Sequence, residues 1–196
     1  MNGLAHTILA GLTLWLGLTR PTLGSSQVGK IDGARSTITV RVYKSGFFSG
    51  LAHDLEIQAP IESGEVKGAD SSSVELRVAA HKLRVLDPEA SEKTRAQIQE
   101  TMEGDKVLDV TRFPEIRFQS TAVEAKRSDH WIVRGTLALH GKERPVAVDM
   151  TLKDEHYRGS ATLRQTDFGI KPLTVAGGTV KVKDEVKIEF EIAFVK

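Results

Sequence analysis

The sequence predicts an all-β protein built as an antiparallel barrel of about eight strands, with one α-helix. From Ile31 onward, apolar and polar residues alternate with a period of two, which is typical of antiparallel strands that bury one face. Eight or nine long strands leave exposed edges unless their sheet closes on itself, so the alternation favours a barrel over a sandwich. The interior of such a barrel is either filled by side chains or holds one apolar ligand, and the pattern leaves both open.

The first residues differ from the rest of the chain. An apolar run over residues 8–18 is too short to span a bilayer comfortably, and small residues follow at 24–26. These features predict a secretory signal peptide over residues 1–24, cleaved near its end, and hence a periplasmic or secreted protein. Arg20 follows the run and no Lys or Arg precedes it, so an uncleaved anchor or a misassigned start codon is the alternative. Residues 25–196 then form a single barrel domain without a permanent membrane anchor.

Each run of alternation marks one strand, and polar or glycine-containing segments separate the runs. The apolar positions of the runs are Ile38, Val40 and Val42; Leu55, Ile57, Ala59 and Ile61; Val74, Leu76, Val78 and Ala80; Ile116 and Phe118; Trp131, Val133, Leu137 and Leu139; Val146, Val148, Met150 and Leu152; and Val186, Ile188, Phe190, Ile192 and Phe194. The turn signals are Glu62-Ser63-Gly64, Ser128-Asp129, Gly141-Lys142 and Ala176-Gly177-Gly178. With no repeat and no linker, the chain is expected to form one domain.

One segment departs from the period of two and predicts the helix. Asp87 and Pro88 fit the N-cap and the first helical position, and Gly104 fits the end. Every fourth residue from Ala90 to Met102 lies on one narrow face. Because the helix is otherwise very polar, we expect it to lie across the end of the barrel or along its side.

Composition excludes several classes of function. The charge is nearly balanced, with 27 Lys and Arg residues against 26 Asp and Glu residues, so no surface for nucleic acid is expected. The absence of cysteine excludes disulfides, thiolate metal sites and a cysteine nucleophile. The histidines are scattered, without an HxH or HExxH arrangement, and the chain has no glycine-rich phosphate loop. We therefore predict no metal site and no cofactor.

The stretch SGFFSGLAHDLEIQ, residues 45–58, is the most suggestive of a site. Phe47 and Phe48 cannot both face inward on a regular strand, so they predict a loop or bulge with at least one ring over a barrel opening. The alternative places one ring in the core and one on the surface. His53 and Asp54 would point to opposite faces of a strand, whereas a general base and its orienting carboxylate must touch. We therefore predict no catalytic residue, and expect His53 to be a structural or ligand-contacting residue near a barrel end, with an ordinary solvated loop as the alternative.

Several segments together resemble the YceI-like family. KVLDVTRFPEIRFQST, residues 106–121, is similar to that family's helix end, followed by Phe-Pro and an Ile-x-Phe-x-Ser-Thr strand. WIVRGTLALHGKERPVAVDM, residues 131–150, resembles its Gly-x-Leu-x-Leu-x-Gly strand, turn and Pro-Val strand. ATLRQTDFGI and DEVKIEFEI resemble its Asp-Phe-Gly-Ile segment and its last strand. Near the start of the barrel domain, residues 50–54 read Gly-Leu-Ala-His-Asp, which resembles the motif of one subgroup of the family.

The resemblance implies an extended, lipocalin-like barrel with one helix and an elongated apolar cavity. It also implies a bound polyisoprenoid, isoprenoid quinone or fatty-acid-like lipid, a periplasmic or secreted location, and no enzymatic activity. We therefore expect an exported protein that holds a long-chain lipid or isoprenoid for sequestration or transport; a homodimer stays open. The alternatives are a hydrolase-like enzyme that uses His53 and Asp54, and a filled barrel that acts as an envelope protein-interaction or stress module.

Alternation also indicates which side chains face the interior. Phe168 lies where one strand closes, and its ring either covers an opening or plugs the core, with core packing the simpler interpretation. The expected ligand-contacting residues are Ile38, Val40, Val42, Phe47, Phe48, His53, Leu76, Val78, Phe118, Leu137, Leu139, Val148, Met150, Leu163, Phe168, Ile188 and Phe190. The same residues would pack a filled barrel, so the alternation predicts inward direction more directly than ligand contact.

Overall fold

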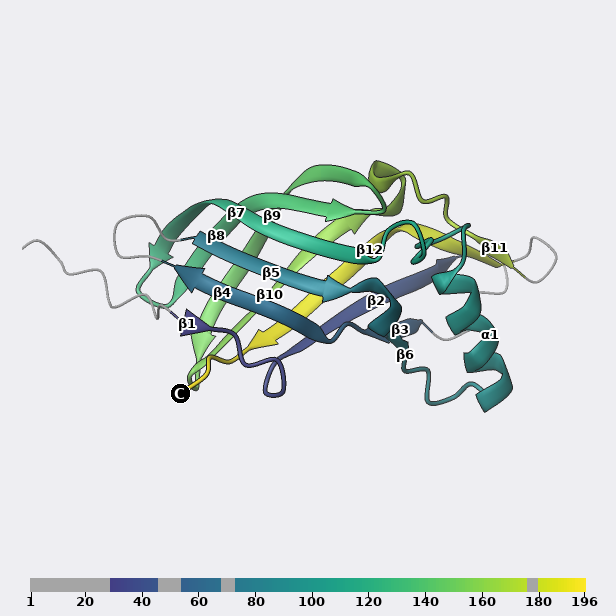
Figure 1. The fold of residues 1–196 in the computed structure, drawn as a ribbon, viewed down its shortest axis with the longest axis horizontal. Helices are drawn as coiled ribbons and strands as arrows, with labels where there is room; N and C mark the ends of the chain where they lie inside the picture. The colour runs from purple at the N-terminus through teal and green to yellow at the C-terminus, as the bar shows by residue number, and fades with distance from the viewer. Residues whose placement is uncertain (1–28, 46–53, 68–72, 176–179) are drawn as a thin grey trace, which may run out of the picture.

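The computed structural model describes residues 29–45, 54–67, 73–175 and 180–196, which form one strongly curved antiparallel sheet with a single α-helix (Figure 1). The strands are β1 (Gly29–Lys30), β2 (Thr37–Ser45), β3 (Leu55–Gln58), β4 (Ile61–Lys67), β5 (Ser73–Ala79), β6 (Arg84–Val85), β7 (Glu115–Arg127), β8 (His130–Leu139), β9 (Lys142–Lys153), β10 (His156–Arg164), β11 (Thr174–Val175) and β12 (Val180–Ile192). The helices are α1 (Glu92–Glu103) and the short 3-10 turns η2 (Ala80–Lys82) and η3 (Gln165–Phe168). The predicted fold class is confirmed. The described residues hold twelve strands rather than eight or nine, because β1, β6 and β11 are too short to show alternation.

The sheet is strongly curled, and the short connection from β3 to β4 links one end of the strand order to the other. Neighbouring strands follow the order β1-β4-β5-β7-β8-β9-β10-β12-β2-β3-β6. β3 pairs with β2, whereas β4, which begins three residues after β3 ends, pairs with β1 and β5. Next to β1, the Asp32 N–H donates to the Ala193 carbonyl at 2.9 Å, so this corner also contacts the end of β12. The result is an elongated shell with α1 at one end of its long axis (Figure 1).

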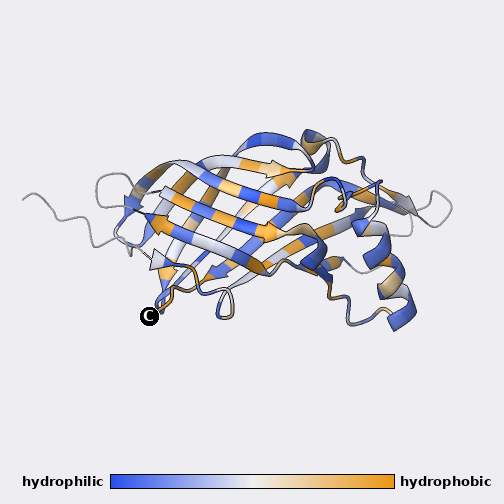
Figure 2. Cartoon of the chain, viewed as in Figure 1, coloured by the Kyte–Doolittle hydropathy of each residue, from blue (hydrophilic) through white to orange (hydrophobic). Residues whose placement is uncertain are grey.

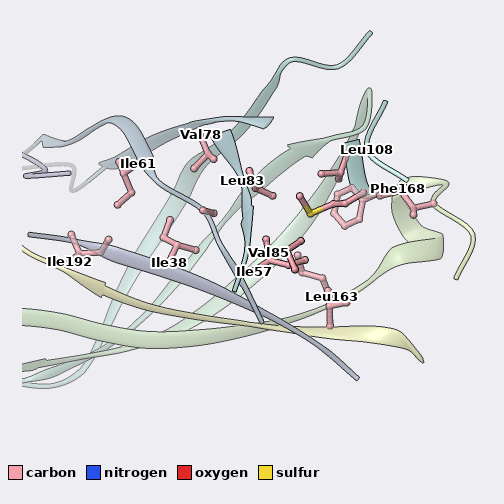
Figure 3. Packing of buried hydrophobic residues seen from close by; sticks show 14 of the residues in the cluster. Ile38, Ile57, Ile61, Val78, Leu83, Val85, Leu108, Leu163, Phe168 and Ile192 are labelled. Carbon is pink, nitrogen blue, oxygen red and sulfur yellow. The ribbon is translucent and has the colours of Figure 1, made fainter. Parts of the chain in front are cut away.

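The two faces of the sheet differ as the alternation predicts, and apolar and polar residues alternate along the strands in Figure 2. On the outer face, the Arg41 guanidinium donates to Glu189 and Glu56, at 2.6 and 3.0 Å, across β12, β2 and β3. Hydrogen bonds from Lys187 and then Arg41 hold the pKa of Glu189 below its usual range. On the inner face, buried apolar side chains such as Ile38, Val78 and Ile192 form one cluster (Figure 3).

Two inward-facing glycines let aromatic rings lie flat against the sheet. A methyl group on Gly135 would stand 2.5 Å from the Phe118 ring and 2.5 Å from the Gln119 carbonyl oxygen. A methyl group on Gly159 would stand 2.6 Å from the Phe190 ring. The sheet can curve tightly here because each ring occupies the space that a side chain on the neighbouring strand would need.

Two turn predictions need correction. Residues 62–64 form no turn: they lie within β4, where the register shifts between Ile61 and Ser63, and the chain bends instead between β3 and β4. Gly64 is required there because a Cβ would stand 2.6 Å from the Ile31 side chain. The β8–β9 turn is His140-Gly141 rather than Gly141-Lys142, with φ values of 51° and 70° that suit a tight two-residue hairpin. The Ser128-Asp129 turn is confirmed, and residues 176–178 lie outside the described residues.

The helix begins later than predicted. Ser91, not Asp87, is the N-cap, and its hydroxyl accepts from the Thr94 N–H at 3.1 Å. The Asp87 carboxylate is instead occupied by the N–H groups of Glu89 and Ala90, at 3.1 and 3.2 Å, and so closes a separate turn before the helix. The end at Gly104 is confirmed.

Helix α1 covers the exposed edge of the sheet at β6. The Gln99 side-chain amide donates to the Leu83 carbonyl at 2.8 Å and accepts from the Val85 N–H at 3.0 Å. These two bonds replace those of a further strand, which protects the edge from pairing with another chain.

We expect Gly135→Ala to destabilise the fold by about 1–3 kcal/mol, because the new methyl group overpacks the contact with Phe118. Gly29→Ala is the matched control, since its methyl group would meet only the Phe194 ring, at an ordinary 3.8 Å. Urea unfolding of both variants measures the difference. Equal midpoints for the two variants would contradict the role assigned to Gly135.

Candidate functional site

The predicted lining residues divide into a fully buried group and a partly exposed group. Buried in the core are Ile38, Val78, Leu163 and Phe168. Partly buried are Val40, Val42, Leu76, Phe118, Leu137, Leu139, Val148, Met150, Ile188 and Phe190. Phe47, Phe48 and His53 lie outside the described residues. Ligand contact stays a prediction for every residue in these groups.

The partly exposed residues form an apolar wall that the rest of the described chain covers only in part. Val148 lies opposite Val133 in the β8–β9 register, and Phe118 lies opposite Leu137 in the β7–β8 register. Directly opposed residues on antiparallel strands point to the same side, and Leu137 lies four residues along β8 from Val133, which is only 3% exposed. All four residues therefore face the interior. In a densely filled barrel, inward side chains would lose nearly all their exposed surface. The wall of β7, β8 and β9 therefore retains apolar surface available to a ligand.

The end of the shell nearest α1 is plugged. Phe168 is 2% exposed and lies in one cluster with Leu108, Ile170 and Met102 of α1 (Figure 3). This burial confirms the core-packing interpretation of Phe168. The side chain of Phe168 therefore closes the apolar core at this end of the shell.

The wall is interrupted between β9 and β10. β9 pairs with β8 along nearly its whole length, but with β10 only from Asp149 to Lys153. Residues 142–148 of β9 thus have no partner on β10, and residues 161–164 of β10 pair only with β12. Pro145 fits this unpaired edge because it has no N–H to donate.

A cleft of about 450 Å³ opens along this seam. It is lined by Arg144, Pro145, Val146 and Ala147 of β9, Thr162, Leu163 and Arg164 of β10, Asp167 and Phe168 of η3, and Glu185 of β12. Leu163 and Phe168 also belong to the buried cluster, and Val146 packs against it. The floor of the cleft is therefore apolar, and its rim is charged.

Hydrogen bonds fix η3 at the edge of the cleft. The Thr166 N–H and hydroxyl donate to the two oxygens of Asp184 on β12, at 2.9 and 2.7 Å. The bond from the Thr166 N–H holds the pKa of Asp184 below its usual range. On the other side, His140 Nδ1 donates to the Phe168 carbonyl at 3.1 Å. Gly169, with φ of 77°, then turns the chain back in a left-handed conformation that favours glycine.

Asp54 takes part in local structure rather than in an assembled catalytic pair. Its exposed carboxylate accepts from the Lys44 N–H at 3.3 Å, next to the connection between β2 and β3. Within the described ranges, no three metal-ligating side chains gather in one place. Helices there are too short or too polar to cross a membrane.

Sequence reasoning missed the seam and its cleft. Pairing between β9 and β10 depends on where distant strands end, which alternation does not report. Pro145 was the available signal, since proline inside a strand pattern indicates an edge.

Residues 30–194 match the YceI-like domain family. The chain belongs to this family. A UPF0312 protein from Pseudomonas savastanoi is 34% identical over 105 residues, which cover 43% of this chain and 55% of that relative, so the match spans about half the relative's length. A UPF0312 protein from Shewanella is 24% identical over 156 residues, which cover 71% of this chain and 74% of the relative.

Solved structures of this YceI-like fold superpose on the chain. Burkholderia cenocepacia BcnA has a TM-score of 0.61 at 16% identity, covering 83% of this chain and 98% of BcnA. A Campylobacter jejuni YceI protein has a TM-score of 0.52 at 12% identity, covering 70% of this chain and 84% of that protein. At these identities, the likeness concerns the fold.

We expect Asp184→Asn to weaken the fold of this YceI-like protein in a pH-dependent way. Because the folded-state pKa of Asp184 is lowered, its contribution to stability is present above the unfolded pKa of about 4 and is lost as pH falls toward the folded pKa. The difference in Tm between wild type and variant should therefore be largest near about pH 7 and shrink below about pH 4. Thermal unfolding followed by circular dichroism measures this difference.

Glu185→Gln is the control, because this neighbouring carboxylate on β12 is not the one that holds Thr166. A Tm difference for Asp184→Asn that stays constant down to about pH 3 would contradict the stabilising role of the charged carboxylate.

Proposed function

We propose that this protein binds a long apolar or amphiphilic lipid inside its shell, and sequesters or carries it through an aqueous compartment. The observation that carries the proposal is the partly uncovered apolar wall of β7, β8 and β9, with Phe118, Val148 and Met150 facing inward. Membership of the YceI-like family, a family of binding proteins with hydrophobic ligands, supports it. The uncovered wall also argues against the alternative of a filled barrel.

The hydrophobic effect alone supplies useful affinity in such a site. Each buried methylene contributes about 0.8 kcal/mol, so ten contribute roughly 8 kcal/mol before ordering costs are subtracted. That gross value corresponds to a Kd of about a micromolar. Retention of a lipid therefore requires apolar length rather than a catalytic group, and no catalytic residue is proposed.

The ligand class and the location are parts of the same proposal. A polyisoprenoid, an isoprenoid quinone or a fatty-acid-like chain each offers enough methylene and methyl groups. The apolar run over residues 8–18 supports export as a signal peptide. In the periplasm or outside the cell, a lipid needs a carrier that shields its tail from water.

We expect Val148→Trp to weaken binding of the neutral methyl ester of cis-parinaric acid by about tenfold, because the indole displaces roughly two methylenes of the ligand. The fluorescence of this probe rises when it enters an apolar site, so titration of lipid-free protein gives Kd directly. Ala138→Trp is the control: Ala138 lies on β8 between the inward-facing Leu137 and Leu139, and so faces outward.

Urea unfolding of both variants, and of the milder Val148→Phe, shows whether weaker binding comes from a filled interior or from an unfolded protein. If Val148→Trp and Ala138→Trp bound the probe equally well, the interior of the shell would not be the binding site.

A further inference from the structure

We propose that the ligand carries an anionic head group, and that Arg144 and Lys142 hold this group at the seam between β9 and β10. The inference rests on the proposed lipid binding, and adds to it the chemistry of the head group and its position.

The inward-facing row of β9 changes from apolar to basic along its length. In order, its members are Met150, Val148, Val146, Arg144 and Lys142. Arg144 lies opposite Leu137 and Lys142 opposite Leu139, and both leucines pack against the buried cluster. Opposed residues share a face, so the two cations continue the row that begins with Met150. The apolar part, from Val146 to Met150, is about 13 Å long.

The basic end of this row stands at the cleft. Arg144 and Val146 both line it. The Lys142 ammonium lies beside η3, since a methyl group on Gly169 would stand 2.8 Å from Nζ. A lipid tail along the apolar part of the row therefore leaves the shell where its head group meets two cations.

Both cations are available to bind an anion. Among the described residues, neither lies within ion-pair distance of a carboxylate, and both are exposed. The Arg144 guanidinium donates to the Glu143 carbonyl at 2.9 Å, which leaves its other donors for a ligand. By contrast, Arg41 and Arg158 on the outer face each hold a carboxylate, at 2.6 and 2.9 Å.

On the bank of the cleft formed by β10 and β12, one acidic and one basic residue lie opposite each other. Glu185 of β12 faces Arg164 of β10 directly in the register, so their charges offset one another. Asp167 lies on η3, which contacts both β9 and β12. The β9 bank is therefore the positive one, and an arginine there can hold a carboxylate or a phosphate through two parallel hydrogen bonds.

The test compares cis-parinaric acid with its neutral methyl ester on wild type, on Arg144→Gln/Lys142→Gln and on Arg164→Gln. We expect wild type to bind the acid at least tenfold more tightly than the ester at low salt. The double variant should lose this preference while its Kd for the ester changes less than twofold. Arg164→Gln, in the same cleft but opposite Glu185, should keep the preference.

Each failure has a separate meaning. Equal affinity of wild type for acid and ester would overturn the anionic head group and leave lipid binding standing. Binding of neither probe would overturn the proposed function itself. A preference that persists in the double variant, or that Arg164→Gln abolishes equally, would overturn the assignment to the β9 bank.

A second pair of ligands distinguishes the two anions. Geranylgeranyl monophosphate and geranylgeraniol compete against bound methyl parinarate on the same three proteins. An advantage of the phosphate over the alcohol that exceeds the advantage of parinaric acid over its ester, and that is lost in the double variant, would assign a phosphate head group. A larger advantage of the acid over its ester would assign a carboxylate, and competition by the neutral alcohol equal to that of the phosphate would overturn an anionic site for isoprenoids.

Discussion

A single sheet with one apolar face has to bury that face against itself, and the shape of this protein follows from that constraint. In the part of the chain that the structure describes, no second sheet lies opposite, and α1 is too polar to cover more than the edge at β6. The sheet therefore curls, and Gly135 and Gly159 allow rings from neighbouring strands to lie against it where it curves. Curling buries Phe168, Leu108 and Met102 near α1, and leaves inward side chains of β7, β8 and β9 partly exposed. The uncovered part is the candidate binding surface.

The same constraint explains the seam. Strand β9 follows β8 through a tight two-residue turn, but it separates from β10 beyond Asp149 because β10 stays with β12. Thr166 and Asp184 then hold η3 across the gap, and Phe168 is pressed into the core beneath it. The opening thus arises because β9 and β10 pair with each other only at one end. At the other end, β9 pairs only with β8 and β10 pairs only with β12. Charged side chains at its rim are reached by solvent, while its floor is apolar.

Local patterns in the sequence predicted the facing of residues well, because strand period is a local property. Predicted inward residues such as Ile38, Leu76 and Phe190 belong to the buried cluster or pack against it, as the alternation indicates. Features that depend on distant pairing were predicted poorly: Asp87 looks like a helix cap but closes an earlier turn, and Glu62-Ser63-Gly64 looks like a turn but is a register shift inside β4. The cleft belongs to this second kind. The predicted mouth residues Phe47, Phe48 and His53 lie outside the described residues.

The central claim is that the shell holds a lipid in its partly uncovered interior. Native mass spectrometry of the protein purified from its own source without detergent, followed by extraction into organic solvent, tests this most directly. The account predicts a stoichiometric adduct of several hundred daltons that passes into the solvent. An unliganded mass, with no lipid in the extract, would contradict it.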